Sequence, residues 1–189
     1  MTTAPAHVPH VYVISGPTAV GKGTVVRALT EAHPELFVSI SATTRAPRQG
    51  EIDGVHYYFV SDEVFDELVA TDDLLEWAVV HRAARYGTPR EPVIEALAEG
   101  KDVILEIDLQ GARQVRRTLP EAVHVFLAPP SWDELIRRLQ GRGTETPEEM
   151  ARRLETAHVE LAHELEFDHV VVNNTLSDTV EQLVRLIGL

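Results

Sequence analysis

Cysteine is absent from this sequence of 189 residues, which excludes disulfide bonds and metal sites built from thiolates. Long apolar runs are also lacking, because no stretch approaches the roughly 20 apolar residues of a membrane-spanning helix. Residues 1–9 have neither the basic segment nor the long apolar segment of a secretory signal, and we expect them to form a flexible tail. The sequence therefore favours a cytoplasmic protein without membrane contact.

Positive charge is scarce, because 17 basic residues face 30 acidic ones and the net charge is −13. Such a chain is not expected to bind nucleic acid along an extended surface. Only two of the basic residues are lysines, Lys22 and Lys101, and the others are arginines. The net charge does not exclude a small anionic ligand where arginines gather in one cleft. The length and the 44% hydrophobic content predict one globular domain.

The segment from Val11 to Thr24 contains the strongest motif. A short apolar run predicts a buried strand, a loop bounded by Gly16 and Gly21 follows, and apolar residues at helical spacing begin after Thr24. Strand, glycine loop and helix are the context of a phosphate-binding loop, in which Lys22 reaches the outer phosphates of a nucleotide. The motif usually has Ser or Thr after the lysine, but here Gly23 follows, so we assign the Mg²⁺-side hydroxyl to Thr24. A plain glycine turn is the alternative interpretation. The predicted ATP-binding residues of the loop are Gly16, Pro17, Thr18, Ala19, Val20, Gly21, Lys22, Gly23 and Thr24.

The rest of the chain alternates between strand and helix patterns. Strands are expected at 36–40, 102–108, 123–127 and 169–173, and helices at 89–99, 111–118, from Ser131, at 148–166 and at 177–187. This order predicts an α/β fold with a mainly parallel sheet flanked by helices. Residues 41–88 differ, because a strand at 55–60, a helix after Ser61 and a strand pair at 74–80 and 84–88 indicate a small mixed insertion.

Several stretches together resemble guanylate kinase, a P-loop nucleoside monophosphate kinase family. They are the loop 15–24, Ser41-Ala-Thr-Thr-Arg45-Ala-Pro-Arg48, Tyr57-Tyr-Phe, Leu75-Glu76-Trp77, Tyr86-Gly-Thr88, Glu106-Ile-Asp108-Leu-Gln-Gly111 and Arg142-Gly-Thr-Glu. The resemblance covers about 10–188. It implies a P-loop NTPase core (10–40, 89–137 and 156–189), a GMP-binding insertion at about 41–88 and a helical lid at about 138–155. It also implies transfer of the γ-phosphoryl group of ATP to GMP with Mg²⁺, in purine nucleotide metabolism.

The basic segment 41–54 suits a phosphate dianion. Arg45 and Arg48 flank a proline, and guanidinium groups match phosphate oxygens. Tyr57 and Tyr86 can each donate a hydroxyl hydrogen bond. By resemblance these four residues hold the phosphate of GMP, although solvated arginines and tyrosines packed on a sheet are the alternatives.

The base site requires acceptors for guanine N1–H and N2–H₂ and donors for O6. By resemblance the acceptors are the carboxylates of Glu76 and Asp108, and the hydroxyl donors are Ser41 and Thr88. Glu106 is expected near the metal and the phosphates, unless it is an acid at a strand end that faces water.

The resemblance also names residues of the lid and of the adenine site. Arg138, Arg142 and Arg153 are the lid arginines, which act in catalysis with Lys22 and Arg45. A solvated helix face is the alternative for each lid arginine. Asn173 follows the last strand, where the family binds the adenine of ATP.

Two other functions share some of these features. Another P-loop kinase of a small molecule, such as a ribose bisphosphate kinase, shares the loop but does not need Glu76, Tyr86 and Thr88. A binding module like the scaffold domains related to guanylate kinase is expected to lose the loop, and the presence of Gly16, Gly21, Lys22 and Thr24 argues against it. We therefore expect ATP and GMP as partners, with neither nucleic acid nor an obligatory protein partner.

Overall fold

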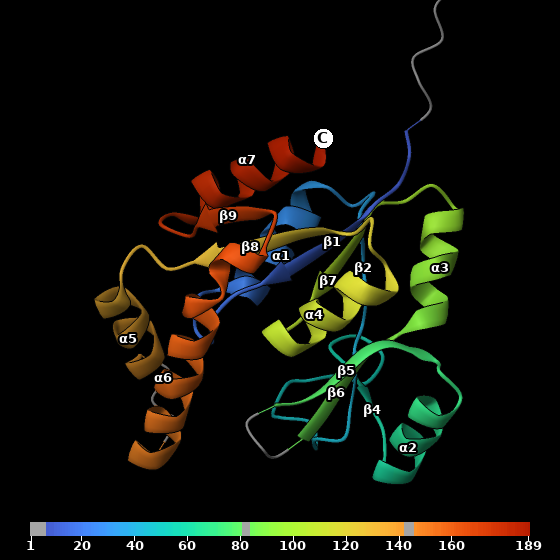
Figure 1. The fold of residues 1–189 in the computed structure, drawn as a ribbon, viewed down its shortest axis with the longest axis horizontal. Coiled ribbons are helices and arrows are strands. Elements are labelled where there is room, and N and C mark those ends of the chain that lie inside the picture. The colour runs from blue at the N-terminus through green and yellow to red at the C-terminus, as the bar shows by residue number, and fades with distance from the viewer. Residues whose placement is uncertain (1–6, 81–83, 142–145) are drawn as a thin grey trace, which may run out of the picture.

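The computed structural model describes residues 7–80, 84–141 and 146–189 (Figure 1). Residues 1–6 of the expected tail, and Arg142 of the expected lid, lie outside the described residues. No helix in the described ranges has both the length and the apolar character needed to cross a bilayer.

A parallel sheet of five strands forms the centre of the fold, in the order β2-β7-β1-β8-β9. Its strands are β1 (Val11–Ser15), β2 (Phe37–Val38), β7 (Val103–Glu106), β8 (Val123–Ala128) and β9 (His169–Val172). Each neighbouring pair runs parallel. Buried side chains alternate between the two faces, as the pleat requires: Val11 and Val13 join one core cluster, whereas Tyr12 and Ile14 join the other.

Helices cover both faces of this sheet. One face packs against α3 (Arg90–Ala98) and α4 (Leu109–Thr118). The other packs against α1 (Lys22–Ala32) and α7 (Leu176–Ile187), which also contact each other. The loop between β1 and α1 therefore opens at the carboxyl edge of the sheet, the usual ligand-binding edge of such folds.

Residues 42–89 supply a second sheet, in the order β4-β3-β6-β5. Its strands are β3 (Ala42–Thr43), β4 (Tyr58–Phe59), β5 (Leu74–Val80) and β6 (Ala84–Pro89), and α2 (Asp62–Ala70) lies beside them (Figure 1). The predicted pair of strands, β5 with β6, is present, and the two strands run antiparallel. The strand expected at 55–60 is reduced to β4, because the amides of Val55 and His56 both bond to the carbonyl of Ile52 in a turn.

Two helices follow β8, namely α5 (Trp132–Gln140) and α6 (Pro147–Ala162), and a 3₁₀ turn at Glu164–Glu166 ends the segment. The helix expected to reach residue 166 therefore ends earlier. The sequence Ser131-Trp-Asp-Glu134 predicts a capping box at the start of α5. The Ser131 side chain accepts the Glu134 N–H as expected, but the Glu134 carboxylate bonds to Arg137 and Arg138 and does not complete the box. Helix α4 begins before the expected residue 111, because the Asp108 carboxylate caps it by accepting the Gly111 N–H at 2.8 Å.

The buried side chain of His124 makes the stability of the core depend on pH. Its side chain is 1% exposed, Nε2 has no hydrogen-bond partner, and the ring meets Phe167 edge-on. Burial, reinforced by Arg116, lowers the pKa of His124 from 6.5 to about 4. The unfolded chain then binds more protons than the native one between these two pH values. The contribution of His124 to the free energy of unfolding is expected to fall by on the order of 3 kcal/mol as pH drops through that window.

Denaturant titrations of the wild type and His124→Gln at several pH values measure this slope. We expect His124→Gln to be less stable at every pH, but its free energy of unfolding should lack the pH dependence that His124 causes. Buried carboxylates with raised pKa values act in the opposite direction in both proteins, so the difference between the two isolates His124. Identical slopes between pH 4 and 6.5 would contradict the assignment.

Candidate active site

The loop between β1 and α1 has the geometry of an anion-binding turn. Gly16 has a φ of 145°, and a Cβ built there would lie 2.3 Å from the carbonyl oxygen of Leu127. Gly21 has a φ of 102° and precedes α1 without a side-chain cap, which leaves N–H groups of the first turn available. The ammonium group of Lys22 bonds back to the carbonyl oxygen of Gly16 at 2.5 Å. The loop thus presents donors and one flexible cation.

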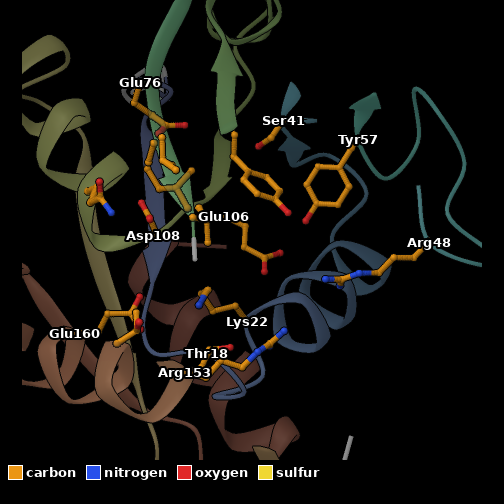
Figure 2. A pocket seen from close by; sticks show the side chains of 17 residues that line it. Thr18, Lys22, Ser41, Arg48, Tyr57, Glu76, Glu106, Asp108, Arg153 and Glu160 are labelled. Carbon is orange, nitrogen blue, oxygen red and sulfur yellow. The ribbon is translucent and has the colours of Figure 1, made fainter. Parts of the chain in front are cut away.

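A cavity of about 440 Å³ extends from this loop to the second sheet (Figure 2). Lys22, Thr18 and Arg153 lie at one end, Glu76 lies at the other, and Glu106 and Asp108 lie between them. Its size is within the usual range for a small-molecule site, about 300–1,000 Å³. Of the predicted residues it brings together Thr18, Lys22, Ser41, Arg48, Tyr57, Glu76, Tyr86, Asp108 and Arg153.

Glu76 forms the closed end of the cavity. The residue is 5% exposed, and Oε1 accepts a hydrogen bond from the Thr88 hydroxyl at 2.6 Å. Burial and the nearby charge of Asp108 raise the pKa of Glu76 to about 7. Its Oε2 lies against α4, where a Cβ on Gly111 would be only 2.3 Å away. A buried carboxyl group with one oxygen held by Thr88 is suited to accept hydrogen bonds from a planar ligand.

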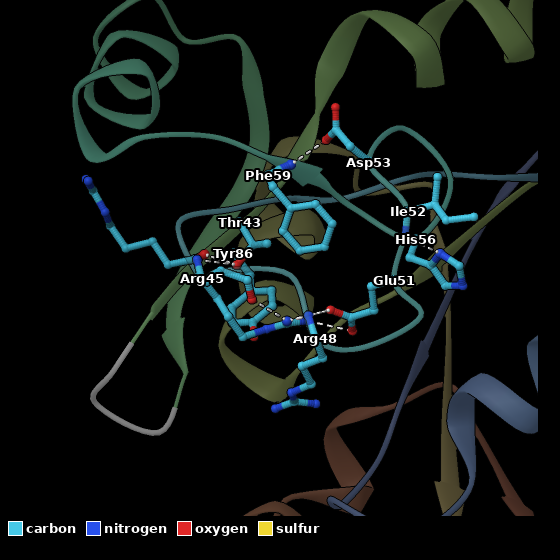
Figure 3. A network of polar contacts seen from close by, with 11 residues as sticks. Thr43, Arg45, Arg48, Glu51, Ile52, Asp53, His56, Phe59 and Tyr86 are labelled. Carbon is cyan, nitrogen blue, oxygen red and sulfur yellow. Dashed lines mark hydrogen bonds and ion pairs between the residues drawn. The ribbon is translucent and has the colours of Figure 1, made fainter.

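Arg45 and Glu51 form an ion pair in the loop after β3 (Figure 3). Two guanidinium nitrogens donate to the Glu51 carboxylate at 2.7 and 3.0 Å, and Nε donates to the Tyr86 hydroxyl at 2.9 Å. The guanidinium also lies 5.1 Å from the centre of the Tyr57 ring. Arg45 lowers the pKa of Glu51 to about 2. The arginine is thereby held against both tyrosines.

A smaller cavity of about 220 Å³ adjoins this pair. Four arginines line it, namely Arg45, Arg48, Arg152 and Arg153, together with Glu149. Two of them come from the loop after β3 and two from α6. Arg48 and Arg153 also line the large cavity, so positive charge from two separate segments converges at its side.

Arg138 and Asn173 meet at the end of the phosphate-binding loop instead of in the large cavity. Arg138 donates to the backbone carbonyls of Val20 and Asn173, each at 3.1 Å. The Asn173 amide donates to the same Val20 carbonyl at 2.7 Å and accepts from the Thr179 hydroxyl. Both residues therefore fix the loop to β9 and α7, and their contacts with a nucleotide stay predictions.

Gly23 lies in the first turn of α1, beside Glu106. A Cβ on Gly23 would lie 3.5 Å from both carboxylate oxygens of Glu106, an ordinary van der Waals distance, so packing does not explain the departure from Ser or Thr at this position. Although the Glu106 side chain is accessible to solvent, partial desolvation by the surrounding cleft raises its pKa, and the charge of Lys22 opposes the rise. Thr24 is exposed in the first turn of α1. No group of three metal-ligating side chains occurs in the part of the chain that the structure describes.

Some residues of the site have no pattern in the sequence that marks them. Glu160, on α6, is 7% exposed, lines the large cavity, and has one carboxylate oxygen without a hydrogen-bond partner. Burial raises its pKa to about 7. Gly111 ends one of the quoted motifs and Glu51 lies in the basic segment 41–54, but only the fold reveals what they contact. A glycine at the start of the helix expected at 111–118 was the available signal for Gly111.

Comparison with known proteins shows the family of the chain. A model of the guanylate kinase family matches residues 9–188. The chain belongs to the guanylate kinase family. A guanylate kinase of Cutibacterium acnes is 62% identical over 179 residues, covering 95% of this chain and 90% of that protein. As kinases, members of this family use ATP with a divalent metal ion.

The fold of this chain is also similar to solved kinase structures. The crystal structure of guanylate kinase from Anaplasma phagocytophilum matches with a TM-score of 0.79 and 32% identity, covering 96% of this chain and 86% of that one. Shikimate kinase from Bacteroides thetaiotaomicron matches with a TM-score of 0.50 and 15% identity, covering 95% and 99%, and shows the fold alone. The predicted P-loop architecture with a parallel sheet flanked by helices is confirmed.

Gly111→Ala tests the contact between α4 and Glu76. Alanine favours a helix over glycine by about 1 kcal/mol. Here the added methyl group meets the Glu76 carboxylate, so we expect a net loss of stability of about 1–3 kcal/mol, typical of overpacking. Denaturant unfolding measures the effect. In a Glu76→Ala background the same change should become neutral or stabilising, and an equal loss in both backgrounds would exclude the contact as its cause.

Proposed function

We propose that the protein transfers the γ-phosphoryl group of ATP to GMP, giving ADP and GDP. The observation that carries the proposal is that one continuous cavity of about 440 Å³ joins two different sites. The phosphate-binding loop and Lys22 lie at one end of this cavity, and the buried Glu76, bonded to Thr88, lies at the other. A nucleoside triphosphate and a purine monophosphate can meet there with their phosphates adjacent. The family to which the chain belongs supports the same reaction.

On the donor side, the loop from Gly16 to Thr24 is proposed to hold the phosphates of ATP. Backbone N–H groups at the start of α1 would bind phosphate oxygens. Lys22 would exchange its bond to the Gly16 carbonyl for the outer phosphates. Asn173 would border the adenine site, where its side chain already fixes Val20.

On the acceptor side, Arg45, Arg48, Tyr57 and Tyr86 are proposed to hold the phosphate of GMP. Arg48 and both tyrosines line the cavity, and Arg45 contacts the Tyr86 hydroxyl behind them. Glu76 would accept N1–H and N2–H₂ of guanine, with Asp108 beside it. Ser41 and Thr88 would act on O6, and the Thr88 hydroxyl would have to turn from Glu76 to do so.

The chemistry demands positioning and positive charge more than covalent help, because little bonding remains to the phosphoryl group in the transition state. Lys22 and Arg153 lie at the loop end of the cavity, where the phosphates of the two nucleotides are proposed to meet. Arg142 and Arg138 are proposed to act with them. Residues 41–88 and 138–155 would be the segments that close over GMP and over the phosphates.

Mg²⁺ is the proposed metal ion, and when bound it would neutralise charge on the transferred phosphates. The Thr24 hydroxyl and the Glu106 carboxylate offer oxygen donors near the start of α1, which suit a hard cation. Because the described residues contain no cluster of three ligating side chains, most ligands would be phosphate oxygens and water. We also propose a cytoplasmic location, where nucleotide substrates occur, and no obligatory protein or nucleic-acid partner.

Lys22→Ala is expected to abolish most turnover while leaving GMP binding nearly intact. Lys22 lies at the donor end of the cavity, away from Glu76 and Tyr57. Removing one charge directed at the transferred group should lower kcat by on the order of 10²-fold or more. A coupled ADP-release assay gives kcat, and calorimetry gives the Kd for GMP. Turnover close to that of the wild type would contradict the role of the loop.

Glu76→Gln is expected to lower kcat/KM for GMP strongly while AMP is unchanged or slightly improved. Adenine lacks the N1–H and the 2-amino group, so AMP leaves the buried carboxylate unpaired, a mismatch able to discriminate by up to about 10⁴-fold. The matching control is Glu99→Gln, on the surface after α3. A ratio of GMP to AMP efficiency that stays within about threefold in a folded variant would show that Glu76 does not read the base.

The wild type and Glu76→Gln are expected to differ in how kcat/KM for GMP depends on pH. The free carboxyl group of Glu76 has a pKa of about 7, and only its ionised form accepts hydrogen bonds at both oxygens. The kcat/KM for GMP is therefore expected to rise as pH increases through about 7 in the wild type. Glu76→Gln should lose this component, and an unchanged pH profile in the variant would assign the titration to another group.

A further inference from the structure

The strand that carries Glu76 is an edge strand of the second sheet. Strand β5 pairs with β6 on one side only, so backbone groups on its other side need partners from elsewhere. Helix α4 of the core packs along that side (Figure 1). The contact joins the second sheet to the helix that begins at Asp108.

Gln114 of α4 supplies partners for this edge. Its Oε1 accepts the N–H of Trp77 at 3.2 Å, and its Nε2 donates to the carbonyl of Trp77 at 2.6 Å. One side-chain amide thus satisfies the hydrogen bonding of both the N–H and the C=O of Trp77, as a neighbouring strand would do. Trp77 directly follows Glu76, so the clamp acts on the residue next to the buried carboxyl group.

Two further residues on the same face of α4 contact β5. Gly111, three residues earlier, lies against Oε2 of Glu76 without room for a Cβ. Thr118, four residues later, donates from its hydroxyl to the carbonyl of Leu75 at 3.3 Å. Residues at this spacing share one face of a helix. Leu75 and Trp77 are therefore hydrogen-bonded to α4, and Glu76 between them packs against the same helix.

This arrangement sets the distance between the two acids of the proposed base site. Asp108 caps α4 at its N-terminus, and Glu76 is fixed to the same helix by the contacts around Gly111 and Gln114. Thr88 on β6 holds only one oxygen of Glu76. A small shift of β5 along α4 would move the carboxylate while leaving the phosphate-binding loop unchanged.

We propose that Gln114 is a positioning residue for base selectivity, which holds β5 in the register that directs Glu76 at guanine. The proposal rests on the proposed function of Glu76. Gln114 does not line the cavity and acts through the backbone of Trp77. Loss of the clamp should therefore affect recognition of the base more than binding of ATP.

The test compares Gln114→Met, which keeps the length of the side chain but cannot make either bond, with the control Arg117→Met on an exposed position of the same helix. We expect Gln114→Met to lower kcat/KM for GMP by about 10- to 100-fold, the range for a displacement near 1 Å. The KM for ATP and the efficiency with AMP should change little, and Arg117→Met should resemble the wild type.

A double-mutant cycle separates positioning from general stability. If Gln114 acts through Glu76, the loss of GMP-over-AMP selectivity caused by Gln114→Met should disappear in a Glu76→Gln background. A selectivity unchanged within about threefold in Gln114→Met, or an equal loss in both backgrounds, would overturn the proposal. So would a parallel loss for GMP, AMP and ATP, which would indicate a purely structural role.

The outcome for Glu76→Gln alone is read independently. If that variant keeps the selectivity of the wild type, the proposed base reading by Glu76 fails, and the proposal for Gln114 fails with it. If Glu76→Gln loses selectivity and Gln114→Met does not, only the proposal for Gln114 fails. Should Gln114→Met not fold, Gln114→Glu decides by the same criteria, because it keeps the acceptor for Trp77 N–H and loses the donor when ionised.

Discussion

Burial of the Glu76 carboxyl group is the constraint on which the rest of the site depends. A carboxylate that is 5% exposed is costly unless hydrogen bonds satisfy it, and Thr88 supplies one such bond. The second oxygen faces α4 at Gly111, where only glycine fits. A ligand with adjacent N–H donors would add hydrogen bonds to those that Thr88 makes with the carboxyl group. This requirement ties the second sheet to α4, and α4 to the carboxyl edge of the central sheet.

The cations of the cavity gather away from Glu76. Although the net charge is −13, Lys22, Arg48 and Arg153 line the middle and the loop end, beside the acids Glu106 and Glu160. Glu76 occupies the opposite end, and Asp108 lies between the two ends. Phosphates and a guanine ring differ in the same sense, because phosphates need donors and the guanine N1–H and N2–H₂ edge needs acceptors. The strongly acidic surface then disfavours nonspecific binding of polyanions, while the cleft keeps local attraction for a small one.

The sequence predicted features that depend on near neighbours in the chain. The loop from Gly16 to Lys22, the parallel sheet and the β5–β6 pair follow from spacing and periodicity. It could not predict contacts between distant segments. Gln114 has the same helical pattern whether or not an edge strand lies beside it, and Asn173 gives no sign that it holds Val20 across 153 residues. The strand expected at 55–60 was too long, because the local turn at Ile52 outcompeted β propensity.

The pair of Arg45 and Glu51 shows how the proposed phosphate site can be prepared before its ligand arrives. Arg45 is already directed at Tyr86 and partly removed from water, so binding a phosphate would need little further ordering of its side chain. The guanidinium must nevertheless share its donors between Glu51 and the incoming dianion. Glu51 also accepts the backbone N–H of Arg48 at 2.7 Å, and this bond would keep it anchored if Arg45 turned toward the phosphate. The acid therefore orients one arginine by its side chain and the other by its backbone, and the loop after β3 can hold both toward one anion.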